Sequence, residues 1–307
     1  MSIRVKFWGV RGSIPCPGSK TMKYGGNTSC IELHFPELHR RIIIDAGSGL
    51  RELGNFMMAN DLKRGPITTD IFLTHTHWDH IMGFPFFTPI YVKGTTIRVH
   101  GPVSFEGDTL EKIVGDQLTY RYFPVRQTEL AARIEYHDLK EGTRDLGDGI
   151  TVTAKYLNHP ILCLGYRFVY QGKTVCTAYD TEPFRNVFCT DPEDPSYDQA
   201  MALEGKVVAQ EQNDVLAQFF SGADLLVHDA QYTEKEYTDK LLGWGHSSFE
   251  HAVTAAKRVG VKSLALFHHD PMRTDDQIDA LSEKYCPKPG PGDPEVFFAR
   301  EGVELDI

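Results

Sequence analysis

Three features are missing from this chain of 307 residues, and each absence excludes a class of protein. No run of about 18 apolar residues occurs, so neither a transmembrane helix nor a membrane partner is expected. The six cysteines lie far apart and form no C-x-x-C pair, which indicates free thiols and not a disulfide framework or a zinc ribbon. The beginning of the chain lacks the apolar stretch of a signal peptide, which favours the cytoplasm.

Positive charge is also scarce. The chain has 32 Lys and Arg against 42 Asp and Glu, a formal charge of −10. Sequence-independent binding of a long nucleic acid needs clustered Lys and Arg, so no such partner is expected. Bound divalent ions could still invert the local field and attract a single phosphodiester. The composition therefore favours a substrate the size of a nucleotide over a long polymer.

The pattern along the chain predicts short strands that alternate with helices, as in α/β proteins. Each half runs from strands to a helix to a strand and ends at a cluster of ligand-type residues, so we expect one domain over residues 1–307, made of two similar halves of roughly 1–145 and 146–307. Segment 184–209 is rich in Asp, Glu and Pro and is expected to be a surface excursion, with a lid as the alternative. The expected strands are 3–10, 29–35, 41–45, 70–74, 97–100, 150–157, 164–170, 173–178, 224–228 and 263–267, and the expected helices are 49–60, 108–118, 211–221, 251–259 and 275–286.

A dense group of metal-binding side chains follows the apolar strand that ends at residue 74. His75, His77, Asp79 and His80 fall within six residues. Imidazole and carboxylate are ligands that suit zinc and related divalent ions. In a loop after a strand, alternation can direct His75 and His77 to one ion, while Asp79 and His80 turn toward a second. The alternative is a polar loop rich in histidine by chance, which four ligand-type residues at this spacing disfavour.

A centre for two metals needs more ligands, and we expect them where later strands end. His159, Asp180 and His268 each follow an expected strand. A short carboxylate such as Asp180 can bridge two cations about 3.5–4 Å apart, although a turn Asp that caps a helix is the alternative. His269 is the rival of His268, because strand alternation turns only one of the two toward the cleft.

The order H-x-H-x-D-H, His, Asp, His, spread over nearly the whole chain, resembles the metallo-β-lactamase superfamily. The resemblance implies a four-layer αββα sandwich in which each half supplies one sheet and its flanking helices. It also implies two sets of metal ligands with Asp180 and a hydroxide bridging them, namely His75, His77 and His159 for one ion and Asp79, His80 and His268 for the other.

Two later stretches narrow the resemblance. L-V-H-D-A at 226–230 is similar to the His-Glu-Ala-Thr stretch of tRNase Z and its phosphodiesterase relatives, and G-H-S-S at 245–248 resembles their His-Ser-Thr stretch. The resemblance implies that His246 protonates the leaving oxygen. Asp79 is expected to orient the attacking hydroxide while it ligates a metal. The alternative for His246 is a residue at a helix N-terminus, before a cap at Ser247.

The chain departs from true tRNase Z in one respect. That enzyme carries a Gly/Pro-rich arm for the tRNA body between its third histidine and its bridging aspartate. Here little more than one hairpin separates His159 from Asp180. Together with the acidic charge, this interval leads us to expect a small phosphodiester such as a cyclic nucleotide; a homodimer is left open.

Other residues have weaker expected roles. Asp45 at a strand end is expected to hold the second ring nitrogen of a ligand histidine, or to cap the next helix. His228 is expected behind the ligands or in a purely structural role. Arg11 is a candidate phosphate contact, although an exposed Arg is more often solvated. The aromatic stretch 120–124 could stack on a base or pack in a core or dimer contact.

The leading expectation is a phosphodiesterase that uses two divalent ions, with zinc favoured and manganese or iron compatible. The same centre also supports hydrolysis of a carbon ester, thioester or lactam. A metal-bound sensor without activity is the third hypothesis, which the complete set of ligands disfavours.

Overall fold

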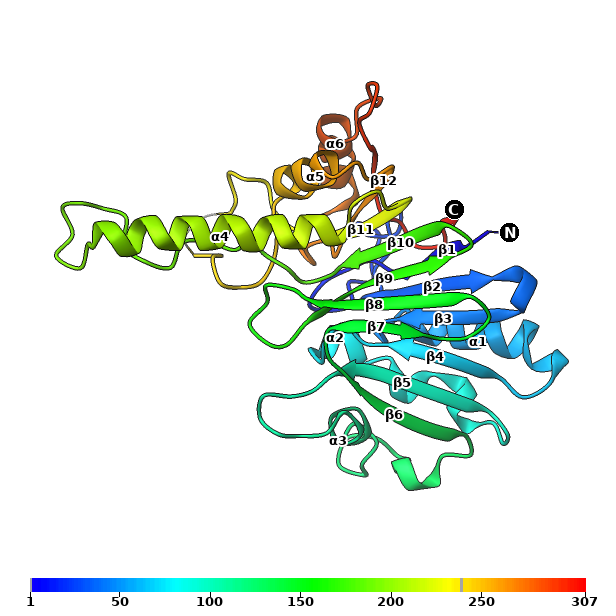
Figure 1. Cartoon of the computed structure of the whole chain (residues 1–307). Coiled ribbons are helices and arrows are strands. Elements are labelled where there is room, and N and C mark those ends of the chain that lie inside the picture. The colour runs from blue at the N-terminus through cyan, green and yellow to red at the C-terminus, as the bar shows by residue number, and fades with distance from the viewer. Residues whose placement is uncertain (1, 238–239) are drawn as a thin grey trace.

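The computed structural model describes residues 2–237 and 240–307. Two seven-stranded sheets stack face to face, with helices on their outer sides (Figure 1). This arrangement confirms the expected αββα sandwich. Among the described residues, no helix is long and apolar enough to cross a membrane.

The first sheet has the strand order β14-β1-β2-β3-β4-β5-β6. Its strands pair antiparallel from β14 to β3 and parallel from β3 to β6. The bounds are Arg4–Gly9 (β1), Cys30–Phe35 (β2), Arg40–Ile44 (β3), Thr68–Phe72 (β4), Thr96–Pro102 (β5), Arg133–Leu139 (β6) and Glu304–Asp306 (β14).

The second sheet has the order β13-β12-β11-β10-β9-β8-β7, antiparallel from β7 to β10 and parallel from β10 to β13. The bounds are Gly142–Asp145 (β7), Ile150–Tyr156 (β8), Leu164–Tyr170 (β9), Lys173–Ala178 (β10), Leu225–Asp229 (β11), Ser263–Phe267 (β12) and Glu295–Phe298 (β13). The helices are Leu50–Asn60 (α1), Trp78–Ile81 (α2), Leu110–Gly115 (α3), Gln199–Phe219 (α4), Phe249–Arg258 (α5) and Asp275–Tyr285 (α6).

Alternating side chains of both sheets meet in one core between them. Phe7 and Phe72 from the first sheet lie in the same buried cluster as Phe168 and Phe267 from the second. The outer faces are covered separately, by α1 and α3 on the first sheet and by α4, α5 and α6 on the second. Because side chains alternate between the two faces of a strand, the central strands of each sheet have buried side chains on both faces. The metal motif lies beyond the C-terminal end of β4.

Several elements differ from expectation. Strands β6, β7, β13 and β14 were not expected, and β14 pairs with β1, so the last strand of the chain completes the first sheet. Helix α4 begins at Gln199, where the Asp198 side chain accepts a hydrogen bond from Met201 N, so only the first part of segment 184–209 is an excursion. In Figure 1 this helix extends well away from the sheets. Ser248 caps α5, not Ser247.

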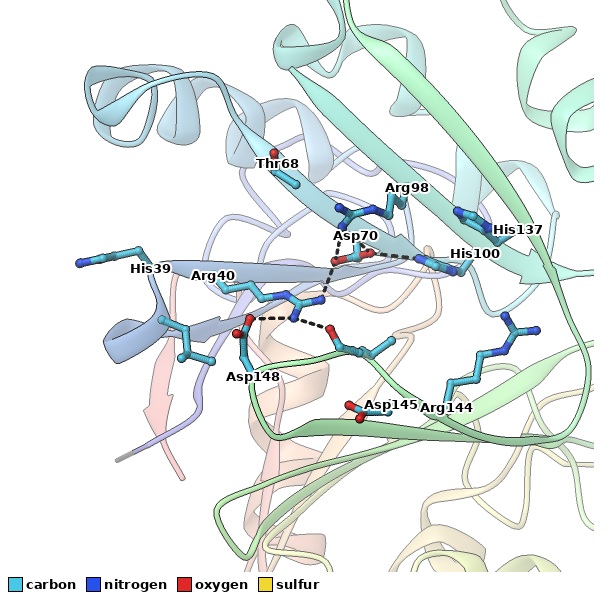
Figure 2. A pocket seen from close by; sticks show the side chains of 12 residues that line it. His39, Arg40, Thr68, Asp70, Arg98, His100, His137, Arg144, Asp145 and Asp148 are labelled. Atoms are coloured by element: carbon cyan, nitrogen blue, oxygen red, sulfur yellow. Dashed lines mark hydrogen bonds and ion pairs between the residues drawn. The ribbon is translucent and has the colours of Figure 1, made fainter. Parts of the chain in front are cut away.

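A cavity of about 630 Å³ lies between the first sheet and the β7–β8 turn (Figure 2). Asp70 lines the cavity and interacts with two other residues there. Its carboxylate accepts a hydrogen bond from Arg40 at 3.1 Å and lies 3.1 Å from His100 Nε2. Burial would raise the pKa of Asp70, but the bonds from His100 and Arg40 lower it to about 2. The charged groups of this cavity thus stabilise one another across strands β3 to β5.

Candidate metal centre

Seven expected ligands lie in loops or short turns beyond the ends of strands, all at one edge of the sandwich. The loop after β4 and the short helix α2 supply four of them, the β8–β9 loop supplies one, and the residues just after β10 and β12 supply one each. These ligands are His75, His77, Asp79, His80, His159, Asp180 and His268.

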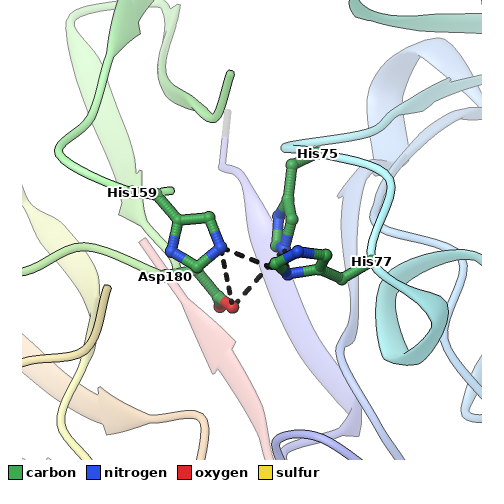
Figure 3. Close-up of side chains that lie close together, drawn as sticks. All are labelled: His75, His77, His159 and Asp180. Carbon is green, nitrogen blue, oxygen red and sulfur yellow. Dashed lines mark hydrogen bonds and ion pairs between the residues drawn. The ribbon is translucent and has the colours of Figure 1, made fainter. Parts of the chain in front are cut away.

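The first group consists of His75, His77 and His159. His77 Nδ1 lies 3.0 Å from His75 Nε2 and 3.2 Å from His159 Nε2 (Figure 3). Ligand atoms 2.0–2.1 Å from a tetrahedral zinc lie about 3.3 Å apart, so this spacing fits one metal ion. These three residues together with Asp180 have ligand atoms within 4.8 Å of one another.

The second group consists of Asp79, His80 and His268. His268 Nε2 lies 3.2 Å from His80 Nε2 and 3.1 Å from Asp79 Oδ2. All three residues are buried. Their ligand atoms also lie within 4.8 Å of one another, which defines a second place for an ion.

Asp180 faces both groups with different oxygens. Its Oδ1 lies 3.3 Å from His80 Nε2 and 3.2 Å from His268 Nε2, while Oδ2 lies 3.5 Å from His75 Nε2. Oδ1 is buried and accepts no hydrogen bond among the described residues. A buried carboxylate oxygen without a donor is costly, and a cation between the two groups would satisfy it.

The electrostatics of the centre also fit divalent cations. Burial lowers the pKa of His75 and His77, and it lowers the pKa of His159 to about 4, so these rings are in the neutral form that binds metal. Burial opposes the charged form of Asp180 too, but the neighbouring His268, His80 and His75 hold its pKa well below the usual range. The donor set and the neutral rings of the first group therefore fit divalent metal ions, as the fold family implies.

The backbone is strained where these side chains leave the sheets. His268, directly after β12, has φ +61°, and Asp45, directly after β3, has φ +62°. Asp180, the second residue after β10, has φ +41°. Non-glycine residues rarely adopt this left-handed region, and such strain is concentrated at functional sites.

Further contacts orient the ligands. Asp45 Oδ2 lies 2.7 Å from His80 Nδ1, and the same carboxylate accepts from Thr74 N at 2.7 Å. The sequence did not indicate two other contacts: Ser13 N donates to Asp79 Oδ2 at 2.7 Å, and the Gln231 amide lies 2.8 Å from His268 Nδ1. Neither has a local sequence signal, because both come from loops distant in sequence.

Two glycines allow a close approach to the ligands. A Cβ on Gly12 would lie 2.5 Å from the His268 ring, and one on Gly245 would lie 2.0 Å from His159 Nδ1. Gly245 also has φ +82°, and its carbonyl accepts from His159 Nδ1 at 3.2 Å. A side chain at either position would displace a ligand imidazole.

His246 joins the centre from the loop before α5. Its Nδ1 lies 2.9 Å from Asp229 Oδ2, and its ring stacks on His268 with a centroid distance of 5.1 Å. Asp180, His246 and His268 have ligand-type atoms within 4.8 Å of one another. Burial would lower the pKa of His246, but the carboxylates of Asp229, Asp180 and Asp79 raise it to about 9.

Two expected contacts are not made. His228 bonds through Nδ1 to the Asp229 carbonyl and packs near Phe220 and His251, because strand alternation turns it toward the helices while Asp229 faces the centre. Arg11 is completely buried and donates to backbone carbonyls, including Gly25 O at 2.8 Å, so it cannot meet a substrate phosphate.

His269 and the aromatic stretch 120–124 also lie apart from the ligands. His269 Nε2 donates to Ala299 O at 2.8 Å, which leaves His268 as the ligand candidate. In the stretch, Tyr120 donates to Glu129 and Phe123 packs edge-on against Phe86. Local packing thus accounts for these two rings.

Comparisons with known proteins identify the family of this chain. A family model described as "Beta-lactamase superfamily domain" matches residues 40–194. Ribonuclease Z of Lactococcus lactis subsp. lactis (strain IL1403) is 30% identical over 275 residues, which cover 79% of this chain and 83% of that protein.

Solved structures share the fold. The metallo-β-lactamase fold protein YhfI from Bacillus subtilis matches with a TM-score of 0.65 at 19% identity, over 99% of each chain. The short form of human tRNase Z matches with a TM-score of 0.62 at 22% identity, over 98% of each chain. At these identities the likeness concerns the fold.

The relatives correct one expectation. We expected a small phosphodiester as partner and no long nucleic acid, but relatives of this chain are named Ribonuclease Z and a structural neighbour is a tRNase Z. Net charge averages over the whole surface, whereas the local field at a metal-binding cleft decides which phosphate chain can approach. The chain belongs to the metallo-β-lactamase superfamily and is a metal-dependent phosphodiester hydrolase.

Proposed function

We propose that this protein hydrolyses a phosphodiester bond in RNA at a centre of two divalent ions, with His246 as the general acid. The observation that carries the proposal is the position of His246, a histidine hydrogen-bonded to Asp229 and placed against the two ligand groups. Hydrolysis of a carbon ester, thioester or lactam has less need of an acid at this place.

The two groups of candidate ligands support the division that the superfamily resemblance implies. The first group would hold one ion and the second group the other, with Asp180 between them. When bound, two such ions supply a hydroxide nucleophile from water near neutral pH and spread the charge that develops on the phosphate oxygens. Ser13 N donates to Asp79 Oδ2, the oxygen that also faces His80 and His268, and so holds the carboxylate in the second group.

His246 provides the proton that the leaving oxygen needs. The bond from Nδ1 to Asp229 Oδ2 fixes the ring, so Nε2 is the nitrogen free to donate. A pKa of about 9 keeps the ring protonated at neutral pH. An alkoxide leaving group such as a ribose oxygen is a poor one, and general acid catalysis assists it by roughly 10²- to 10⁴-fold.

RNA is the substrate class that the ribonuclease Z relatives support. The short interval between His159 and Asp180 leaves no room for an RNA-binding arm between these two residues. A precursor tRNA with a 3′ extension and a short single-stranded RNA therefore test the two sizes of RNA substrate.

The proposal is tested with the metal-loaded full chain, after metal analysis. The panel contains both RNAs, bis(p-nitrophenyl) phosphate, a thioester and a β-lactam, and it includes cyclic mono- and dinucleotides because the sequence suggested them. We expect cleavage of an RNA phosphodiester. Inert RNAs with both metals bound, together with turnover of the thioester or lactam, would overturn the proposal.

A further inference from the structure

A groove of about 420 Å³ lies beside the metal centre. One wall is the segment that connects β5 to α3 and includes Val103 and Phe105, and the other wall is the β8–β9 loop with Ile161 and Leu162. The groove therefore lies between loops from both sheets, as the metal centre does.

The groove adjoins the ligands directly along the chain. Thr76, which lines it, stands between His75 and His77, and Pro160, which also lines it, follows His159. A substrate held at the first ligand group therefore has this groove as a neighbouring surface.

The chemistry of the groove suits a flat, uncharged group better than a phosphate. The Phe105 side chain is 76% exposed, and no aromatic ring or cation packs on it within the described part of the chain. Glu106 at the same groove has a carboxylate without a hydrogen bond or ion pair among the described residues. This negative charge repels phosphate, whereas it can accept hydrogen bonds from exocyclic amino groups of bases.

We propose that this groove is a subsite for the nucleobase next to the scissile phosphodiester, where Phe105 stacks on the base and Glu106 favours bases with an amino group. The inference rests on the proposed function, because it assumes an RNA substrate. Stacking on an aromatic side chain contributes about 10- to 100-fold in affinity, and it tolerates every base because each has a π face.

The experiment uses short RNAs in which the nucleoside on one or the other side of the cleaved bond is replaced by an abasic ribose. With Phe105→Ala, we expect KM to rise about 10- to 100-fold on RNA with both bases and kcat to be retained. On the RNA abasic at the subsite position, the variant and the parent should be equal. Phe105→Trp should restore the parent KM on the complete RNA.

Leu203→Ala is the matched control, because Leu203 is an exposed apolar side chain (64%) on the protruding helix α4. It should change neither KM nor kcat. An equal effect of Phe105→Ala on complete and abasic RNAs, or no effect on either, would overturn the subsite. If the parent protein cleaves no RNA at all, the proposed function fails instead, so the two failures can be distinguished.

Base preference tests Glu106 separately. The parent should favour cytosine, adenine or guanine over uracil at the subsite, because uracil lacks an exocyclic amino group. Glu106→Ala should reduce this preference without lowering kcat on the abasic RNA. A preference that stays the same in the variant would exclude Glu106 from the subsite.

Discussion

Replacing His246 with alanine gives the most direct test of the proposed chemistry. The imidazole is held by Asp229 at 2.9 Å, and the neighbouring carboxylates raise its pKa to about 9, which favours the protonated ring at pH 7. Loss of the side chain should cost the full contribution of a general acid, roughly 10²- to 10⁴-fold in kcat, or about 3–5 kcal/mol in the barrier.

The size of the loss should depend on the leaving group. RNA releases a ribose alkoxide that needs a proton, whereas bis(p-nitrophenyl) phosphate releases a phenolate that is stable without one. His246→Ala should therefore lower kcat on RNA by the full factor and lower kcat on the aryl ester much less. The assay is steady-state kcat on both substrates at pH 7, with metal content measured on the same samples.

His137→Ala is the matched control, because His137 is a half-exposed histidine in the cavity of Figure 2 and contacts none of the ligands. It should leave both rates unchanged. Equal losses of His246→Ala on both substrates would show that His246 only positions other groups. Undiminished RNA cleavage with both metals bound would remove it from the mechanism.

Three further changes test the same structure. The Asp229 carboxylate helps to raise the pKa of His246 to about 9, against the effect of burial. In Asp229→Asn the pKa of His246 should therefore fall, and the loss of kcat on RNA at alkaline pH should begin at a lower pH in a pH–rate profile. An unchanged profile would contradict this role of Asp229. Asp70 has a folded-state pKa of about 2, below its usual 3.8, so its stabilisation of about 2 kcal/mol is present above about pH 4 and lost as pH falls toward 2. Urea unfolding of Asp70→Asn should show a free energy of unfolding lower than that of the parent by about this amount at pH 7, and by less near pH 3. Equal decreases at both pH values would contradict the role of the ionised Asp70 carboxylate. Gly245→Ala should displace a ligand imidazole and weaken metal retention in a chelator titration, whereas Gly243→Ala, with φ +85° and nothing within 4 Å of the added Cβ, should retain metal.

The helical and strand pattern predicted most of the sandwich, but not its edge strands or the start of helix α4. Edge strands such as β7, whose side chains are all exposed, carry no apolar alternation that a pattern could detect. The pattern did not predict the start of α4, because an acidic, Pro-rich stretch precedes the helix. The capping residue Asp198 cannot be distinguished in the sequence from the other Asp residues of that stretch. Pairing of β14 with β1 joins residues about 300 positions apart, for which no local signal exists.

The sequence by itself determined the fold family and the seven ligand candidates, because four of the ligands are adjacent along the chain and the other three stand where predicted strands end. Only the tertiary structure decided which of the neighbouring polar residues reach the centre. Asp229 contacts His246 while His228 faces the helices, and Arg11 is buried against backbone carbonyls. Such choices depend on the face of a strand and on loops that are distant in sequence, and these are settled only when the two sheets pack together.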